Sequence, residues 1–557
     1  MKKIKRTYIL SLLAILGVAV SSCSDSYMEN LNTDPSKANS INPNAQLTNA
    51  ELQTYGDLSM VEIYRNYHYA FSQQLMGCWN TTNYGGRHTL DNNEMSRIWT
   101  SFYPKAIKNL TDGIYRSKEN TSLSNINAAL RIYRVYMMSL ITDIYGDAPC
   151  SEAGLGFLEE KYNPRYDTQE EMYTWFFKEL KDAGDSLNLS RDKITGDVIY
   201  KGDVSKWKKL ANSLRLRYAM RISDVAPEKA QQEFEDALTS AGGVFANASD
   251  DALIKYMEVS FSFGQESYSD YRGNALSQLL FGNDPANNPS YLCSTFFNQM
   301  KNSGDPRTFR IARFYYDGLM SSTSTNNRID LTDEVLKKGV TMKPRDPGAF
   351  SWEPWPTGYD SDIMKQIALT NPSVATSMAR ETEPKLANNF LKSNNPGVIM
   401  TFAETNFLLA EAALKGWNVS GAVADLYTTG VRASMNFISD NYGCDKITDE
   451  DFNTFIAKNG IGYTYEQKKA AINTQAWILH FTNPSESWAN VRRSGYPRLK
   501  SPADYDFGQF LTGGVEIPVR LCYPVLESSY NKQGYDEALS RMGGNNSWNT
   551  PLWWDVN

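Results

Sequence analysis

The sequence predicts an all-α protein in which antiparallel helix pairs lie on either side of an irregular, loop-rich centre. Apolar residues recur at steps of three and four along most of the chain, which is the spacing that places them on one face of a helix. Strict alternation of apolar and polar residues is almost absent, so any strands are expected to be short. The centre, residues 245–398, lacks the helical period and is rich in Pro, Gly, Asn and Ser.

Before this centre the periodicity predicts five helices. Their expected ranges are 94–118, 122–145, 168–189, 204–222 and 228–240. The second ends at Gly146, and the third opens with Thr168 and Glu171 in the spacing of a capping box. The fifth ends at Gly242 and Gly243, because glycine commonly terminates a helix.

After the centre the helical period resumes, and the expected ranges are 399–417, 419–437, 465–481 and 487–493. Tight turns between consecutive helices indicate stacked antiparallel hairpins of the tetratricopeptide kind. No 34-residue repeat aligns along the chain, so the repeats are structural only. Within the centre only brief helices are expected, around 292–301 and 360–367. A long irregular stretch of this kind is more often functional than idle.

The amino terminus has the three parts of a secretory signal. A basic start is followed by an apolar run over residues 8–20, and small residues then lead into Cys23. That run is shorter than the roughly 20 residues that a helix needs to span a bilayer. The ending Val20-Ser21-Ser22-Cys23 looks like the lipobox of bacterial lipoproteins, whose cysteine is acylated; an ordinary cleaved signal is the alternative. We expect a signal peptide over 1–22, a lipidated tether over 23–45 and one domain over 46–557, with a helical scaffold in 46–244 and 399–530 and an insert in 245–398.

Composition excludes several classes of function. Without the four basic residues of the signal, 52 basic residues remain against 63 acidic ones, a net charge of −11. This balance argues against binding nucleic acid and against lying flat on an anionic membrane. The cysteines after Cys23 number five, never in CxxC spacing, so neither a zinc site nor a full disulfide framework is expected and one pair stays open. They are Cys78, Cys150, Cys293, Cys444 and Cys522, and most are expected to be small buried hydrophobes.

Catalytic signatures are weak, and no enzyme, cofactor or metal site is expected. The three histidines show no ligand spacing, and no GxSxG or GxxxxGK motif occurs. Glu404 and Glu411 lie two helical turns apart, about 10.5 Å along the axis, whereas glycosidase carboxyl pairs are roughly 5–9.5 Å apart. We expect both to be buried and to pair with arginines such as Arg215, Arg217 and Arg493 as part of the scaffold.

Several long segments resemble the SusD/RagB family of outer-membrane nutrient-binding lipoproteins. Residues 142–153 read TDIYGDAPCSEA and resemble the family segment TDxYGDVPYSEA. The other matching segments follow in order: YDTQEE at 166–171, GDVSKW at 202–207, NSLRLR at 212–217, ETNFLLAEAALKG at 404–416, WANVRRSGYP at 488–497 and EIPVRLCYP at 516–524. Cys150 departs from the usual Tyr, and Ala476 from a long polar residue.

The resemblance implies a SusD-like fold in which tetratricopeptide-like helix pairs support an irregular ligand-binding half. It implies a lipoprotein, anchored through Cys23 to the outer membrane and facing the cell surface, that is not an enzyme. Its partner would be a SusC-like TonB-dependent transporter, and its ligand a glycan or, as the alternative, a peptide. A ligand-free lid on the transporter remains a third possibility. Ligand sites in the family are built from variable loops, so their residues do not transfer by motif.

Sugar rings stack on aromatic side chains and present hydroxyls to polar ones, so aromatic loops rich in amides are the candidate sites. Three loops have this chemistry; the alternative is that their aromatics cover the helical half or touch the transporter. Their candidate residues are Trp79, Asn80, Asn83, Tyr84 and Arg87 in loop 78–87, Trp352, Trp355, Tyr359 and Asp360 in loop 350–360, and Tyr268 in loop 267–272.

Overall fold

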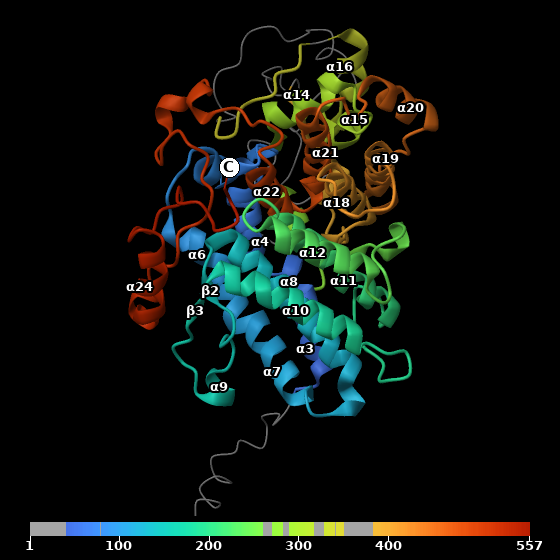
Figure 1. Ribbon diagram of the computed structural model, residues 1–557. Coiled ribbons are helices and arrows are strands. Elements are labelled where there is room, and N and C mark those ends of the chain that lie inside the picture. Colours follow the sequence, from blue (N-terminus) through green and yellow to red (C-terminus); the bar gives the residue numbers. More distant parts are fainter. Residues whose placement is uncertain are drawn as a thin grey trace, which may run out of the picture. The chain divides into compact units, whose positions relative to one another are not determined.

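The computed structural model describes residues 41–77, 80–259, 270–281, 289–316, 328–339, 341–349 and 383–556 (Figure 1). Residues from Pro43 onward form one compact unit. This unit is mostly helical, which confirms the predicted fold class. Among the described residues no helix has the length and apolar character to cross a membrane.

The first part of the unit contains all five helices predicted before the centre. The longer ones are α3 (Pro43–Gly56), α4 (Leu58–Ile63), α6 (Asn92–Ser101), α7 (Lys108–Ser117), α8 (Ser124–Tyr145), α10 (Gln169–Ser186), α11 (Val204–Arg221) and α12 (Pro227–Thr239). A π-helical turn, Phe102–Ile107, joins α6 to α7 within the single helix expected there. The capping box at α10 is confirmed, because the Thr168 and Glu171 side chains each bond to the other's backbone N–H.

Helix α3 has no counterpart among the predicted ranges, and its buried side chains explain why. Gln46, Glu51 and Gln53 are buried beside Leu47 and Ala50. The buried face of α3 is therefore partly polar. For this reason the sequence of α3 does not show apolar residues at the helical spacing of 3.6.

The second helical part begins later than expected. Its helices are α18 (Phe402–Leu414), α19 (Val423–Tyr442), α20 (Asp449–Lys458), α21 (Tyr465–Leu479), α22 (Pro484–Ser494) and α24 (Lys532–Arg541). The prediction that Ile399 is helical is wrong: it belongs to strand β10 (Gly397–Met400), which pairs with β4 (Ala252–Ile254). The Thr401 side chain then accepts from the Glu404 backbone N–H and starts α18.

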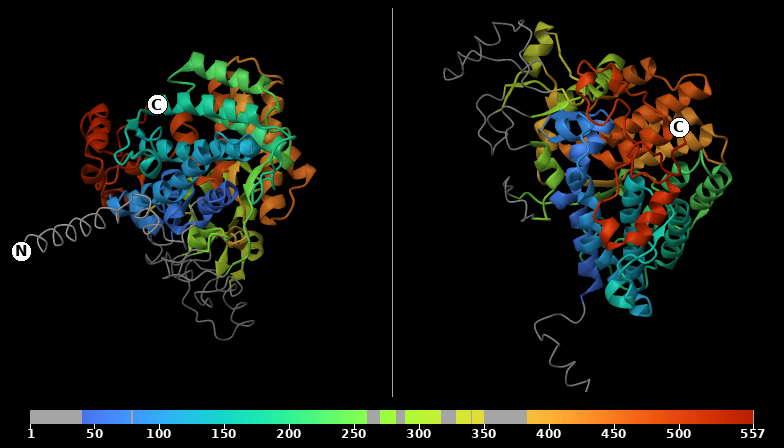
Figure 2. Two further views of the ribbon diagram at one scale, coloured as in Figure 1. Left: turned by 90° about the horizontal axis from the view of Figure 1, so that it is seen from below. Right: turned by 90° about the vertical axis from the view of Figure 1, so that its left-hand side faces the viewer.

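Consecutive helices pack side by side, as the hairpin prediction requires. Helices α7, α8, α10, α11 and α12 each contact the next in the chain, and α18 contacts α19 and α21. Helix α3 packs on α7 and α8 and also on α13 (Ala275–Phe281) of the centre. In both views of Figure 2 the blue segment that contains α3 therefore lies between the α8–α12 helices and the central segments.

Buried ion pairs hold α18 to α11 of the first helical part and to α22 of the second. Arg217 of α11 binds Glu404 of α18 through two hydrogen bonds of 2.6 and 2.8 Å. Arg493 of α22 binds Glu411 of α18 through two bonds of 2.7 Å. Burial alone would raise the pKa of Glu404, but Arg217 and His480 hold this pKa at about 2. The predicted scaffold role of these two glutamates is confirmed.

The other two arginines of the matched segments find different partners. Arg215 pairs with Glu233 and Asp236 of α12. Arg492 donates to the backbone oxygens of Val519 and Asp143 at 2.6 and 2.8 Å.

Short strands and brief helices make up the described centre. Strands β1 (Leu75–Gly77), β5 (Ser290–Leu292), β9 (Lys385–Leu386) and β6 (Ala312–Arg313) form one antiparallel sheet in that order. The helices are α13, α14 (Ser294–Ser303), α15 (Thr308–Ile311) and α16 (Thr332–Lys338). The expected brief helix at 292–301 is thus confirmed, and that at 360–367 lies outside the described residues.

The described cysteines are small buried residues, as predicted. Cys150, Cys293, Cys444 and Cys522 are buried and free. Burial raises the pKa of the Cys150 thiol to about 12, so this sulfur is an unreactive thiol. Cys23 and Cys78 lie outside the described residues.

Candidate ligand-binding site

A surface hollow of about 820 Å³ lies where three segments of the loop-rich half meet. These segments are the start of α14, residues 344–349 and residues 498–510. The side chains that line the hollow include Ser294, Thr295, Asn298, Arg345, Asp346, Arg498, Lys500, Asp506, Phe507 and Phe510. Its lining thus combines aromatic rings with side chains of both charges, amides and hydroxyls.

Asp346 ties two of the three segments together. Its carboxylate accepts from the Ser294 hydroxyl at 2.5 Å and from the Lys500 ammonium at 2.8 Å. Asp346 itself is buried, and charge-assisted bonds of this length are strong. The position of residues 498–500 relative to α14 is therefore well defined.

Gln73 connects the hollow to the helical part behind it. Its amide nitrogen donates to the Lys500 backbone oxygen at 2.7 Å and to the Tyr505 hydroxyl at 2.8 Å. Its amide oxygen accepts from the Thr295 hydroxyl at 2.5 Å. Burial raises the pKa of Tyr505, so its hydroxyl stays protonated. These bonds give the hollow a rigid polar base.

The outer wall of the hollow offers groups that suit a sugar. Phe510 is 57% exposed, whereas Phe507 is buried. The side chains of Asn298, Arg498 and Asp506 are exposed at the same hollow. An aromatic face beside amide, guanidinium and carboxylate groups can stack on a C–H face and bind hydroxyls.

The first predicted loop lies against this hollow but is not an open loop. Residues Thr82–Gly86 form a π-helical turn, and the half-buried Tyr84 ring packs 6.1 Å from that of Tyr67. The reason lies in Gly85 and Gly86: a Cβ on either would come within 2.4 Å of backbone atoms of Asn66 or Gly348. The two glycines thus allow close packing here, so the prediction of a loop is wrong.

Arg87 links this turn to the segment that lines the hollow. Its Nε donates to the Gly348 oxygen at 2.9 Å, and its guanidinium lies 5.8 Å from the centre of the Phe507 ring. Asn83 is half-buried in the same turn, and Asn80 is half-buried just before it. Arg87 therefore supports the wall from behind and is not among the residues that line the hollow.

The remaining candidate residues lie outside the described part of the chain. They are Trp79, Tyr268, Trp352, Trp355, Tyr359 and Asp360. The described chain before the second loop ends at Ala349, which itself lines the hollow. Of the third loop, Asp270 and Arg272 form an ion pair of 2.7 Å, and neither lines the hollow.

Residues 505–510 were not predicted as a site, although their sequence carries the same signal as the loops that were. Tyr505, Phe507 and Phe510 alternate with Asp506, Gly508 and Gln509 after the last long scaffold helix. Applied there, the criterion of aromatics beside polar residues and glycine would have identified them. Asn298 and Arg498 carry no such signal, because only the fold brings them together.

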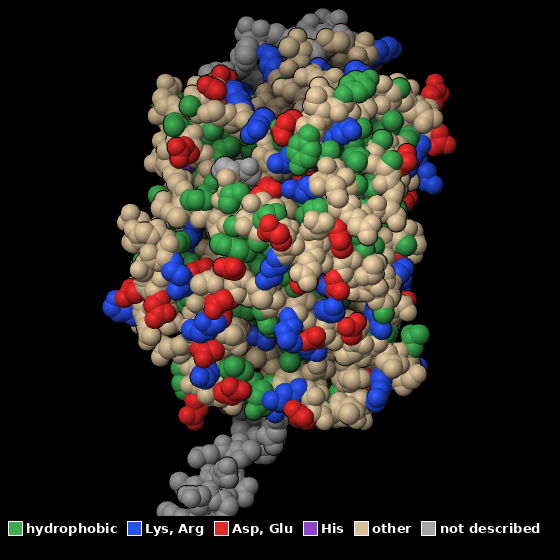
Figure 3. All heavy atoms as spheres, viewed as in Figure 1, with side chains coloured by type: hydrophobic (Ala, Val, Ile, Leu, Met, Phe, Trp, Pro, Cys, Tyr) green, Lys and Arg blue, Asp and Glu red, His purple; other side chains and the backbone are tan. Residues whose placement is uncertain are grey.

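Charge is mixed on the face of the molecule drawn in Figure 3. Lysine and arginine side chains are interspersed with aspartate and glutamate across this face. Such a surface favours neither a polyanion nor a polycation as ligand.

The helical scaffold and the loop-rich half with its open hollow define a helical protein with a candidate small-ligand site. Residues 35–337 match the family described as "Starch-binding associating with outer membrane". Residues 358–555 match the family described as "Susd and RagB outer membrane lipoprotein". The chain therefore belongs to the SusD/RagB family, as its sequence motifs indicate.

Solved structures agree with this assignment. A SusD-like protein of Bacteroidetes is 48% identical, with a TM-score of 0.87 over 93% of this chain and 100% of that one. A protein described as chitin-binding is 30% identical, with a TM-score of 0.75 over 93% and 100% of the two chains. A SusD homologue of Bacteroides uniformis, 23% identical with a TM-score of 0.69 over 92% and 99%, shares the fold. None of the curated proteins matches the chain.

Proposed function

We propose that this lipoprotein captures an oligosaccharide in the hollow beside α14 and delivers it to a SusC-like TonB-dependent transporter. The observation that carries the proposal is the exposed Phe510 ring next to Asn298, Arg498 and Asp506 in a hollow of about 820 Å³. That volume lies within the range of roughly 300–1,000 Å³ of small-ligand sites. The chitin-binding relative supports a glycan as the ligand class.

In this proposal Phe510 stacks on a sugar ring, and Asn298, Arg498 and Asp506 bind its hydroxyls. Trp352, Trp355 and Tyr359 belong to a segment that follows Ala349 directly, so we propose that they extend the same site. Trp79, Asn80, Asn83, Tyr84, Asp360 and Tyr268 remain proposed contacts of the same kind. Fully covering an exposed phenylalanine side chain contributes about 1.5–3 kcal/mol, so the loss of the Phe510 ring should be measurable.

Native affinity electrophoresis tests the proposal. The soluble chain that begins after Cys23 is run through gels containing plant, host or microbial glycans. Retardation by one glycan class, with the retardation lost in Phe510→Ala and Arg498→Ala, supports the site. The matched control is Phe157→Ala on α9 (Gly156–Glu159), whose ring is 88% exposed but does not line the hollow.

A peptide is the second candidate ligand, and the opposite charges of Arg498 and Asp506 favour it. These side chains suit the carboxylate and amine of a short peptide. If no glycan retards the protein while a peptide library binds and Arg498→Ala abolishes that binding, the ligand class is peptide. If neither class binds, the protein is a ligand-free lid.

The anchor and the partner have tests of their own. We propose that Cys23 is acylated and that the body faces the cell surface. Incorporation of a labelled fatty acid, lost in Cys23→Ala, tests the anchor, and degradation by protease added to intact cells tests the orientation. Co-purification of a TonB-dependent barrel with the lipoprotein from outer membranes tests the partner.

A further inference from the structure

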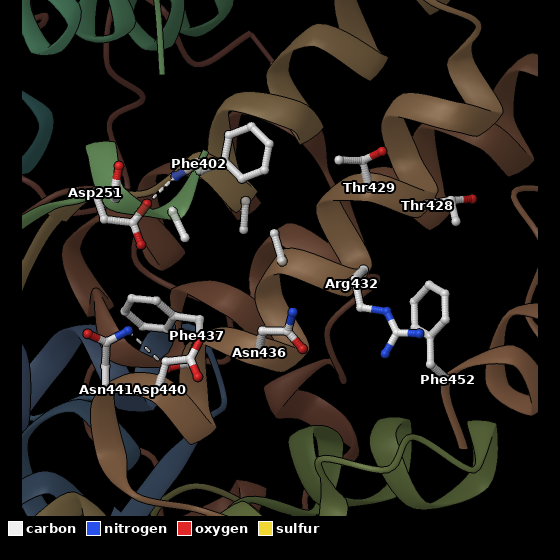
Figure 4. Close-up of a pocket in the computed structure, with 14 residues that line it drawn as sticks. Asp251, Phe402, Thr428, Thr429, Arg432, Asn436, Phe437, Asp440, Asn441 and Phe452 are labelled. Carbon is white, nitrogen blue, oxygen red and sulfur yellow. Dashed lines mark hydrogen bonds between the residues drawn. The ribbon is translucent and has the colours of Figure 1, made fainter. Parts of the chain in front are cut away.

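A second pocket, of about 600 Å³, lies among the scaffold helices and shares no residue with the hollow. It is bounded by α18, α19, α20 and the segment before β4 (Figure 4). The proposed glycan site does not include this pocket.

Apolar side chains line this pocket on several sides. Phe402 and Ala403 come from the start of α18, Ala433 and Phe437 from α19, and Phe452 from α20. Phe437 and Phe452 are buried, while Phe402 is half-buried. These rings give the pocket an apolar surface on which the apolar part of a small molecule can pack.

Two carboxylates lie at one end of the pocket: that of Asp251, which is half-buried, and that of Asp440, which is exposed. One Asp251 oxygen accepts from the Phe402 backbone N–H at 2.7 Å. Within the described part of the chain, the other Asp251 oxygen and the Asp440 carboxylate have neither an ion pair nor a hydrogen bond. Figure 4 shows Asp251 and Asp440 on the same side of the pocket, with the Asn436 amide nearby.

The basic side chains around the pocket do not neutralise this acidic end. Arg432 lies toward the opposite end in Figure 4, 3.7 Å from the centre of the Phe452 ring, and pairs with Asp449 at 2.7 Å. The charge of Lys255 lowers the pKa of Asp251, but within the described residues this exposed side chain forms neither a hydrogen bond nor an ion pair with Asp251. The acidic end is therefore open to an added cation.

Burial makes such a cation favourable. It raises the pKa of Asp251 to about 7, and Asp250 and Asp440 act in the same direction. A carboxylate that is desolvated and repelled by like charges is stabilised by any positive group placed beside it.

From this geometry we propose that the second pocket binds a protonated primary amine carried on a small apolar body. The ammonium would lie between Asp251 and Asp440, with the Asn436 amide as a further acceptor, and the apolar body would pack on Phe402 and Phe437. A metal ion fits less well, because calcium takes six to eight oxygen ligands and no group of three acidic, His or Cys side chains in the described residues is placed to hold one. A neutral sugar would leave both carboxylates without a counter-charge.

Calorimetry with two isosteric probes tests this assignment. 2-Phenylethylamine and 2-phenylethanol are titrated into the soluble chain at pH 8, where Asp251 is mostly ionised. We expect the amine to bind at least about tenfold more tightly than the alcohol, since pairing with a desolvated carboxylate favours the charged probe. Equal affinities, or no measurable binding of the amine at millimolar concentration, would overturn the proposal.

Variants locate the binding. Asp251→Asn keeps a side-chain oxygen that accepts from the Phe402 backbone N–H, and it should lower amine affinity at least about tenfold. Asp440→Asn should lower this affinity less. The control is Asp425→Asn on the same helix α19, an exposed side chain outside the pocket. Amine affinity that survives the Asp251→Asn, Asp440→Asn double variant would contradict the assignment, as would equal losses in the control. Glycan retardation, which depends on other residues, should be the same in all these variants.

Discussion

The Arg217–Glu404 pair allows a quantitative prediction about how α11 is held to α18. Its side chains are 4% and 3% exposed, and two hydrogen bonds of 2.6 and 2.8 Å join them. Replacing Glu404 with Gln keeps the shape but leaves the Arg217 guanidinium without its main counter-charge. Breaking a buried pair costs about 3–5 kcal/mol. Glu486, 3.6 Å from Arg217 Nε, compensates in part, so we expect about 3 kcal/mol.

The pKa of Glu404 gives the same magnitude by a second route. In the folded protein this pKa is about 2, against 4.5 for an unperturbed side chain. Each pKa unit corresponds to about 1.4 kcal/mol, so the shift corresponds to about 3 kcal/mol. Because the folded pKa is depressed, this stability is present above pH 4.5 and is lost as the pH falls through 2.

Urea unfolding of the wild type and Glu404→Gln at several pH values measures both quantities. The expected difference in the free energy of unfolding is about 3 kcal/mol at pH 7 and shrinks below pH 4.5. Glu233→Gln is the control, because Glu233 is 26% exposed and its partner Arg215 also binds Asp236, so its cost should be about 0–1 kcal/mol. A loss under about 1 kcal/mol for Glu404→Gln at pH 7, or a pH-independent difference, would refute the reasoning.

Two further substitutions test other parts of the account. Burial raises the pKa of Glu51, and the charge of Asp197 raises it further. Because the folded pKa lies above the unfolded one, the stability contributed by protonated Glu51 is complete below the unfolded pKa and is lost as the pH rises through the folded pKa. Glu51→Gln should gain thermal stability relative to the wild type between pH 4 and pH 8, and a relative loss over that range would contradict the sign. Gly86→Ala should cost about 1–3 kcal/mol in urea unfolding, because its Cβ would lie 2.4 Å from the Gly348 nitrogen, whereas Gly460→Ala meets nothing closer than 3.9 Å and serves as the control.

The parts of the fold that the sequence predicted are those whose signal is local. Helix α8 carries a continuous apolar face, and α10 begins at a capping box that can be read from Thr168 and Glu171. Helix α3 buries polar side chains, so its period is obscured. Strand β10 was read as helix because its apolar residues run directly into α18, and only pairing with β4 reveals it.

The hollow was harder to predict, because its lining comes from segments some 200 residues apart. Asn298 and Arg498 meet only after Asp346 and Gln73 have fixed the two segments together. The first predicted loop is close to this hollow, since Arg87 contacts Gly348, and its contact with a ligand stays a prediction. The expected open loop is wrong, because its glycines permit close packing against backbone.

Affinity electrophoresis of the wild type and Phe510→Ala on a glycan panel is the most direct test of the central claim. The account predicts that one glycan class retards the wild type and Phe157→Ala equally, while Phe510→Ala migrates as in a gel without glycan. Equal retardation of all three proteins would remove the hollow from the binding site, and unchanged migration on every glycan would contradict glycan capture itself.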